Sequence, residues 1–196
     1  MRAREVIDSG EWARMQGQTT FDNVDELFAL GMSSVKLNDL ARADAAADHL
    51  RDASQTLPDR DQREVVAIMA SQIAGLLQIA RGEQDAGLAA LARTADQEAL
   101  RPKPVARPYP VKPAAELYAE ALLAAGRPAD AVAQFQRALA RTPRRGAALI
   151  GLARAAHAAG ATATSTRAAR DFLGAWHRAD ADRPELAEAR SLLGSN

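Results

Sequence analysis

The stretch that decides the fold is 113-PAAELYAEALLAAGRPADAVAQFQRALARTP-143. Apolar residues recur every three or four positions on both sides of Gly126, which predicts two amphipathic helices joined by a tight turn. A second such turn follows at Gly160, 34 residues further along the chain. A single helical hairpin cannot bury its apolar face alone, so hairpins that repeat at this spacing are expected to stack on one another.

The rest of the chain has the same helical period, and no stretch shows the sustained alternation of a strand. We therefore expect an all-α fold, a right-handed α-solenoid of about four helical hairpins with partial helices at both ends. Five segments are expected: a partial N-terminal hairpin over 1–20, two hairpins over 21–97 of which the second is degenerate, a proline-rich connection over 98–112, two hairpins over 113–180, and a C-terminal capping helix over 181–196.

Particular residues predict how these helices begin and pack. Asp39 is suited to cap the N-terminus of a helix, since its carboxylate can accept from free backbone N–H groups. Gly31 is small enough to let two helix backbones approach closely. Phe172 and Trp176 lie four positions apart on one face of a helix expected to extend to about Ala179. That face is expected to receive the last helix.

The segment 101-RPKPVARPYPVKP-113 contains five prolines. Each proline removes a backbone donor and restricts φ, so helix is excluded and an extended conformation is expected. The segment is either a lengthened connection laid against the array or an exposed recognition segment. In the first case Tyr109 would pack against the helices.

Composition limits the function classes. Lys plus Arg and Asp plus Glu both number 25, and cysteine is absent. The balance argues against a strongly basic nucleic-acid binder, and the missing thiols exclude disulfides and thiolate metal sites. No apolar run reaches the length of about 20 residues that spans a bilayer. No signal peptide is recognisable in residues 1–20.

No pattern in the chain predicts catalysis. The histidines lack the HExxH spacing, and a metal site would need His157 and His177 to be brought together by folding. Glycine-rich phosphate loops are absent, and Ser71 has no nucleophile-elbow context. Glu116 and Glu120 could form a carboxylate pair, but exposed glutamates on a helix are far commoner. We expect no enzyme, no cofactor and no metal.

The pattern of residues in the chain resembles that of the tetratricopeptide repeat superfamily. The residues at the family's spacing are Tyr118, Ala119, Gly126, Ala131, Phe135, Ala138 and Pro143. The order of parts, with a Ser9–Trp12 turn, the GRPADA turn and the terminal RPELAEAR, is similar to the C-terminal part of bacterial tetratricopeptide proteins of unassigned function. Such relatives carry more repeats and often an export signal upstream.

The resemblance implies a non-catalytic scaffold that binds a protein or peptide segment in a concave groove. A carboxylate clamp is not implied, because only one basic residue is suitably placed. Nucleic acid and membrane-spanning partners are not expected. An ordinary solvated helix face is the simpler reading of the positions that would line the groove, which are Phe28, Met32, Val35, Glu116, Glu120, Leu123, Ile150, Arg154 and His157.

A structural role is the alternative. The chain could be the C-terminal domain of a larger exported bacterial protein, packing on its own upstream repeats through Trp12 and the apolar 28–35 face. The chain would be cytoplasmic if Met1 is the native start and periplasmic if it is a fragment. We favour the fragment, because residues 1–17 resemble a hairpin that lacks most of its first helix.

Overall fold

The computed structural model describes residues 2–18, 23–103, 110–177 and 183–194. These residues form helices, turns and irregular connections and contain no strand, so the predicted all-α helical-repeat fold is confirmed. The chain divides into two compact units, residues 1–117 and 118–196. The helix Ala114–Ala124 (α6) crosses the boundary between them.

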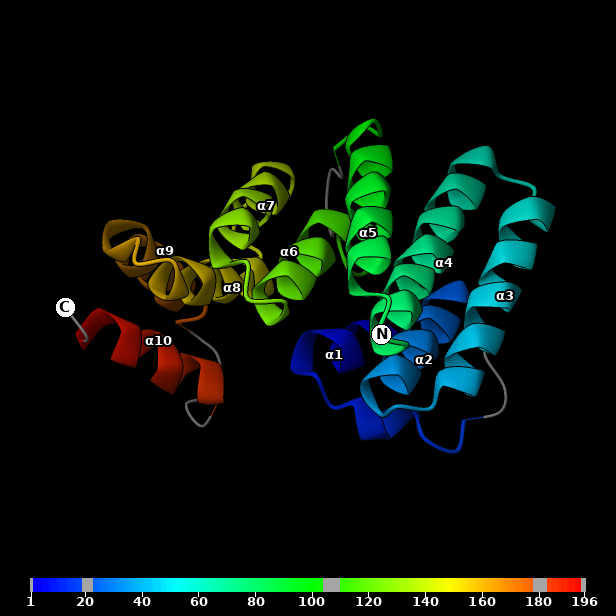
Figure 1. The fold of residues 1–196 in the computed structure, drawn as a ribbon, viewed down its shortest axis with the longest axis horizontal. Coiled ribbons are helices and arrows are strands. Elements are labelled where there is room, and N and C mark those ends of the chain that lie inside the picture. Colours follow the sequence, from blue (N-terminus) through cyan, green and yellow to red (C-terminus); the bar gives the residue numbers. More distant parts are fainter. Residues whose placement is uncertain (1, 19–22, 104–109, 178–182, 195–196) are drawn as a thin grey trace. The chain divides into compact units, whose positions relative to one another are not determined.

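Unit 1 contains two long helical hairpins preceded by a short helical segment (Figure 1). Within it α2 packs on α3 and α4, α3 packs on α4, and α4 packs on α5. The elements are α1 (Arg2–Ser9), the 3-10 turn η1 (Trp12–Met15), α2 (Val24–Lys36), α3 (Leu40–Thr56), α4 (Arg60–Ala80) and α5 (Gln84–Ala99).

Capping residues explain where three of these helices begin. The carboxylate of Asp39 accepts from the backbone N–H of Arg42 at 3.2 Å, which confirms its predicted role. Asn23 and Asp59 cap α2 and α4 in the same way. Each cap satisfies one of the donors that the first helical turn leaves free.

Small residues allow the close packing of unit 1. A Cβ atom at Gly31 of α2 would overlap with the side chain of Ile73 of α4 and press on Ala46 of α3. The predicted close approach at Gly31 is therefore present, and Ile73 fills the space. Through such contacts the apolar stripes of neighbouring helices pack together into one continuous buried layer.

Helix α4 differs from the expectation that no segment is long and apolar enough to span a bilayer. Among the helices of the described chain, α4 alone has the length and apolar composition to cross a membrane, whereas no such stretch was expected from the sequence. However, 56% of its apolar window is buried in the protein. That burial is typical of a core helix, because α2, α3 and α5 all pack on it.

The N-terminal segment covers α2. Both α1 and η1 pack on that helix, and the side chain of Phe28 is completely buried. The second piece of this segment is a single 3-10 turn rather than the expected short helix. Gly10 and Gly17 flank it at positive φ, a conformation that glycine adopts without strain.

A buried polar cluster holds residues 112–114 within unit 1. Residues 110–113 are not helical, and Tyr109 lies outside the described residues. The Nζ atom of Lys112 lies 2.9 Å from Oε1 of Glu116, and both side chains are buried. Gln72 donates to the carbonyl of Lys112 at 2.9 Å, and Glu98 accepts from the backbone N–H of Ala114.

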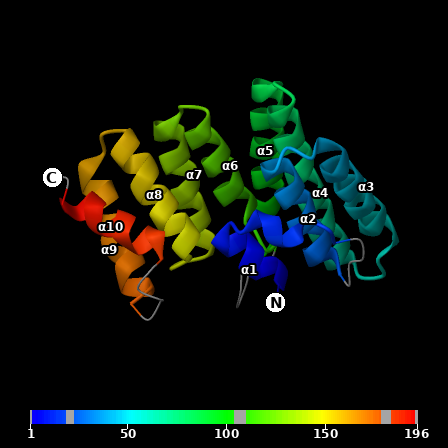
Figure 2. The ribbon, with the colours of Figure 1, turned by 90° about the horizontal axis from the view of Figure 1, so that it is seen from below.

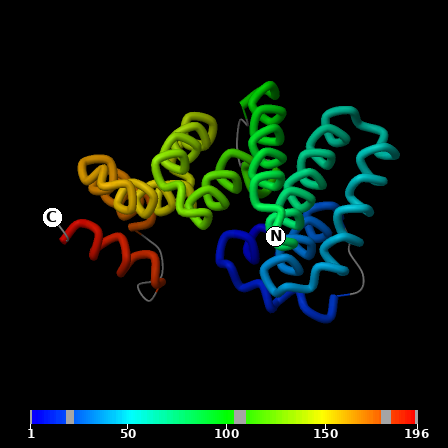
Figure 3. Tube along the Cα trace, in the orientation of Figure 1, coloured from blue at the N-terminus to red at the C-terminus, as the bar shows by residue number. Residues whose placement is uncertain are grey.

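Unit 2 repeats the hairpin pattern (Figure 2). Within it α7 (Pro128–Arg141) packs on α8 (Gly146–Ala158), and α8 packs on α9 (Thr162–Ala175). The last helix, α10 (Pro184–Gly194), packs on α9 and α8 (Figure 3). Gly126 and Gly160 both have φ of +71°, a conformation that glycine adopts without strain.

The end of α9 differs from the expectation. The helix stops at Ala175, before the expected end at Ala179, and position 179 lies outside the described residues. The rings of Phe172 and Trp176, which were expected to share one face, stack with centroids 5.3 Å apart. The guanidinium of Arg183 lies 5.1 Å from the centroid of Trp176, which adds a cation–π contact just before α10.

Candidate partner-binding surface

Four of the nine predicted groove residues belong to the interior. Phe28, Met32 and Ile150 are buried apolar side chains, and Glu116 is buried in its ion pair with Lys112. A partner could not contact them without displacing the protein's own core. The prediction is corrected at these positions, because all four side chains are buried rather than open to a partner.

The other five predicted residues reach the surface. Val35 is half-buried in the last turn of α2, in unit 1. Glu120 and Leu123 of α6 are half-buried in unit 2, and Arg154 and His157 of α8 are exposed there. We call the last four, Glu120, Leu123, Arg154 and His157, the unit-2 face.

The unit-2 face, together with Glu188 beside it, carries charges that alternate along the repeat. Glu120, Arg154 and Glu188 are each separated by 34 residues and lie on α6, α8 and α10. The guanidinium of Arg154 makes a bidentate contact with Glu188, with Nε 2.6 Å from Oε1. Hydrogen bonding to Glu188 raises the pKa of Arg154 above its ordinary value, against the opposing effect of burial, and the charge of Glu120 adds to the rise.

Glu188 was not among the predicted residues. The 34-residue spacing from Arg154 could have identified it, since α10 occupies the position of the first helix of a further hairpin. Arg154 therefore has a structural partner within the chain. Its side chain is 44% exposed and that of Glu188 is 37% exposed, so the pair is still open to a ligand at its edge.

A family comparison matches the cleanest hairpin of the chain. The tetratricopeptide repeat model matches residues 113–155, which include α6, α7 and most of α8. This segment is a tetratricopeptide repeat. The predicted assignment to the tetratricopeptide repeat superfamily is thereby confirmed. Proteins with such repeats generally mediate protein–protein interactions, and the match supports a helical-repeat scaffold of that kind.

Two further comparisons concern solved structures and curated proteins. The solved structure described as MamA AMB-1 aligns with a TM-score of 0.46 and 17% identity, covering 95% of this chain and 93% of that chain. No curated protein matches the sequence.

The described residues contain no group of three or more His, Asp or Glu side chains that could hold a metal ion. His157 lies in the last turn of α8, where a basic residue suits the helix dipole. His177 instead contacts the carbonyl of Gly174, with Nδ1 2.9 Å from the oxygen. The chemistry offered by the unit-2 face is therefore ion pairing and apolar contact.

We expect Glu188→Arg to loosen α10, because two guanidinium groups would then face each other. The pair is partly exposed, so the free energy of unfolding should fall by only about 1 kcal/mol or less. The sensitive measurement is amide hydrogen exchange, which should accelerate in α10. The swapped pair Arg154→Glu with Glu188→Arg should restore protection. Equal exchange in the single and double variants would contradict the role of this pair.

Proposed function

We propose that the protein is a non-catalytic scaffold that binds a segment of a partner protein through the unit-2 face. The observation that carries the proposal is the alternation of Glu120, Arg154 and Glu188 at one position of successive repeats. A row of alternating charges can pair with a complementary row on a partner and set its register.

Apolar contact would add to these charges. Leu123 is half-buried and lies three residues after Glu120 on α6, and His157 has the equivalent place on α8. Leu123 can therefore bury more area when a partner covers it, which is favourable in proportion to the apolar surface removed from water. The surrounding charges then act as a polar rim around an apolar centre.

The structural alternative has less support. It requires Trp12 and the apolar 28–35 face of α2 to be available for packing with upstream repeats, and Trp12 is half-buried. Phe28 is instead buried, and α1 and η1 of the same chain pack on that helix. Binding of a separate partner through the unit-2 face is the better-supported proposal.

Site-specific photocrosslinking tests the proposal. A photoreactive amino acid replaces Leu123 in one variant and Arg170, an exposed residue of α9, in a control variant. After incubation with extract of the native source, position 123 should yield discrete crosslinked proteins that position 170 does not. The proposal fails if the two positions capture the same chains or if position 123 captures none.

A charge-swapped variant makes the test specific. Arg154→Glu with Glu188→Arg keeps the pair within the chain but reverses the charge order that a partner meets. We expect the crosslinked yield at position 123 to fall about tenfold or more, since like charges at an interface cost several kcal/mol. An unchanged yield would mean that the alternating charges do not contribute to binding.

A further inference from the structure

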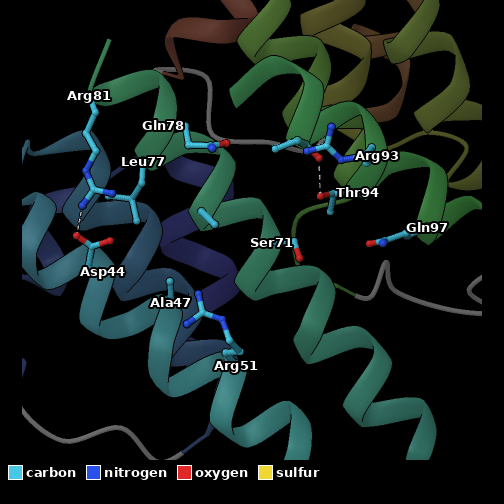
Figure 4. Close-up of a pocket in the computed structure, with 12 residues that line it drawn as sticks. Asp44, Ala47, Arg51, Ser71, Leu77, Gln78, Arg81, Arg93, Thr94 and Gln97 are labelled. Carbon is cyan, nitrogen blue, oxygen red and sulfur yellow. Dashed lines mark hydrogen bonds and ion pairs between the residues drawn. The ribbon is translucent and has the colours of Figure 1, made fainter. Parts of the chain in front are cut away.

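Unit 1 has a polar recess on helices that the proposed function does not use. It lies between α3, α4 and α5 and has a volume of about 420 Å³ (Figure 4). That volume lies within the range of small-molecule sites. We call it the α3–α5 recess, and its polar lining residues include Arg51, Ser71, Gln78, Arg81, Arg93 and Gln97.

The recess exists because small side chains occupy its walls. Ala47 of α3, Ala74 of α4 and Ala90 of α5 all line it, so the three helices leave space between them. Each helix contributes residues at three- or four-residue spacing, which places them on one face. From Ser71 to Arg81 the floor along α4 is about 15 Å long, the length of four or five extended residues.

The charges of the recess favour an anionic ligand. Three arginines line it against a single carboxylate, that of Asp44. Arg81 pairs with Asp44, and Arg51 pairs with Asp48, but all four side chains are more than 40% exposed. Exposed pairs of this kind contribute little stability, so either guanidinium can turn to a ligand at small cost.

Arg93 is the cation that a ligand would meet first. Its side chain forms no ion pair or hydrogen bond with any residue in the described part of the chain. Figure 4 shows it on the α5 side of the recess, across from the Arg81–Asp44 pair. A guanidinium presents several N–H donors in a planar fork that matches a carboxylate.

The remaining polar groups suit a peptide backbone. Gln78 and Gln97 each carry one amide acceptor and one amide donor, the same pair that a backbone peptide group offers in reverse. None of the described residues that line the recess is aromatic, so it has no surface on which a nucleic-acid base could stack. The recess thus combines carboxylate recognition with backbone recognition.

We infer that the α3–α5 recess binds a short acidic peptide segment in an extended conformation. Arg93 holds a carboxylate of that segment, with Arg51 or Arg81 available for a second. Gln78 and Gln97 bind its main chain. This site uses unit 1 alone and is independent of the unit-2 face, so either proposal can fail while the other stands.

Fluorescence anisotropy with labelled octapeptides tests the inference on the full chain. A glutamate-rich octapeptide should bind more tightly than its glutamine counterpart, and a lysine-rich one should not bind. Arg93→Gln should weaken binding of the glutamate peptide about tenfold or more, since it removes a charge-assisted hydrogen bond. The matched control is Arg167→Gln, an exposed arginine of α9, which should leave the affinity unchanged.

A second variant tests whether peptide binding depends on the shape of the recess. Ala74→Leu leaves the charge unaltered but fills the floor, so it should also weaken binding of the glutamate peptide about tenfold or more. The inference is overturned if glutamate and glutamine peptides bind equally, or if neither Arg93→Gln nor Ala74→Leu lowers the affinity. Full displacement of the peptide by inorganic phosphate at equal concentration would overturn it in favour of a small-anion site.

Discussion

Lys112→Met is expected to lower the free energy of unfolding by about 3–5 kcal/mol, because it removes the cation that lies beside the buried carboxylate of Glu116. Both side chains are at least nine-tenths buried, and their charged atoms lie 2.9 Å apart. Methionine keeps the length of the lysine stem, so the loss reports on charge rather than on a cavity. Urea denaturation followed by circular dichroism measures the change.

Two further variants test whether the loss of stability depends on the burial of the charged groups. Lys36→Met removes an exposed lysine at the end of α2 and should change the free energy of unfolding by no more than about 0.5 kcal/mol. The double variant Lys112→Met with Glu116→Leu removes both charges and should recover most of the lost stability. If the double variant were less stable than the single one, the loss of the cation beside a buried carboxylate could not be the cause.

Phe135→Ala should destabilise unit 2 by about 3–5 kcal/mol, since the ring is completely buried. The ring lies where a Cβ atom of residue 151 would be, so Gly151 on α8 is the reason that it fits. Gly151→Ala alone should therefore also destabilise the protein, by about 1–3 kcal/mol, through overpacking. Urea denaturation of both variants gives these values.

The two substitutions should be strongly non-additive. Once the ring is absent, Gly151→Ala fills part of the cavity and gains about 1 kcal/mol of helix propensity. In the Phe135→Ala background it should therefore be neutral or stabilising. Additive losses would mean that Phe135 and Gly151 do not share a contact that limits packing.

The helices and their turns were predictable because they depend on local chemistry. The positive φ of Gly126 and Gly160, the cap at Asp39 and the stacking of Phe172 on Trp176 all involve residues within a few positions of one another. The 34-residue spacing between Gly126 and Gly160 likewise relates two hairpins that follow each other directly in the chain. These features need no knowledge of how distant segments meet.

The predicted groove was less accurate because burial depends on which segments cover a helix. A hydrophobic pattern places Phe28 on a face of α2, but only the fold shows that α1 and η1 pack on that helix. Whether a charged side chain is buried also depends on which segments cover it. Glu116 could be read as an exposed glutamate, yet the chain brings Lys112 beside it in the interior.

The sequence by itself determined the all-α repeat, its turns and its caps, since these follow from the 34-residue spacing and from interactions between near neighbours. Only the tertiary structure decided which polar side chains are buried, that Glu188 engages Arg154, and that three helices leave a recess lined by Arg51, Arg81 and Arg93. The physical reason is that burial and cavity shape depend on contacts between residues far apart in the chain.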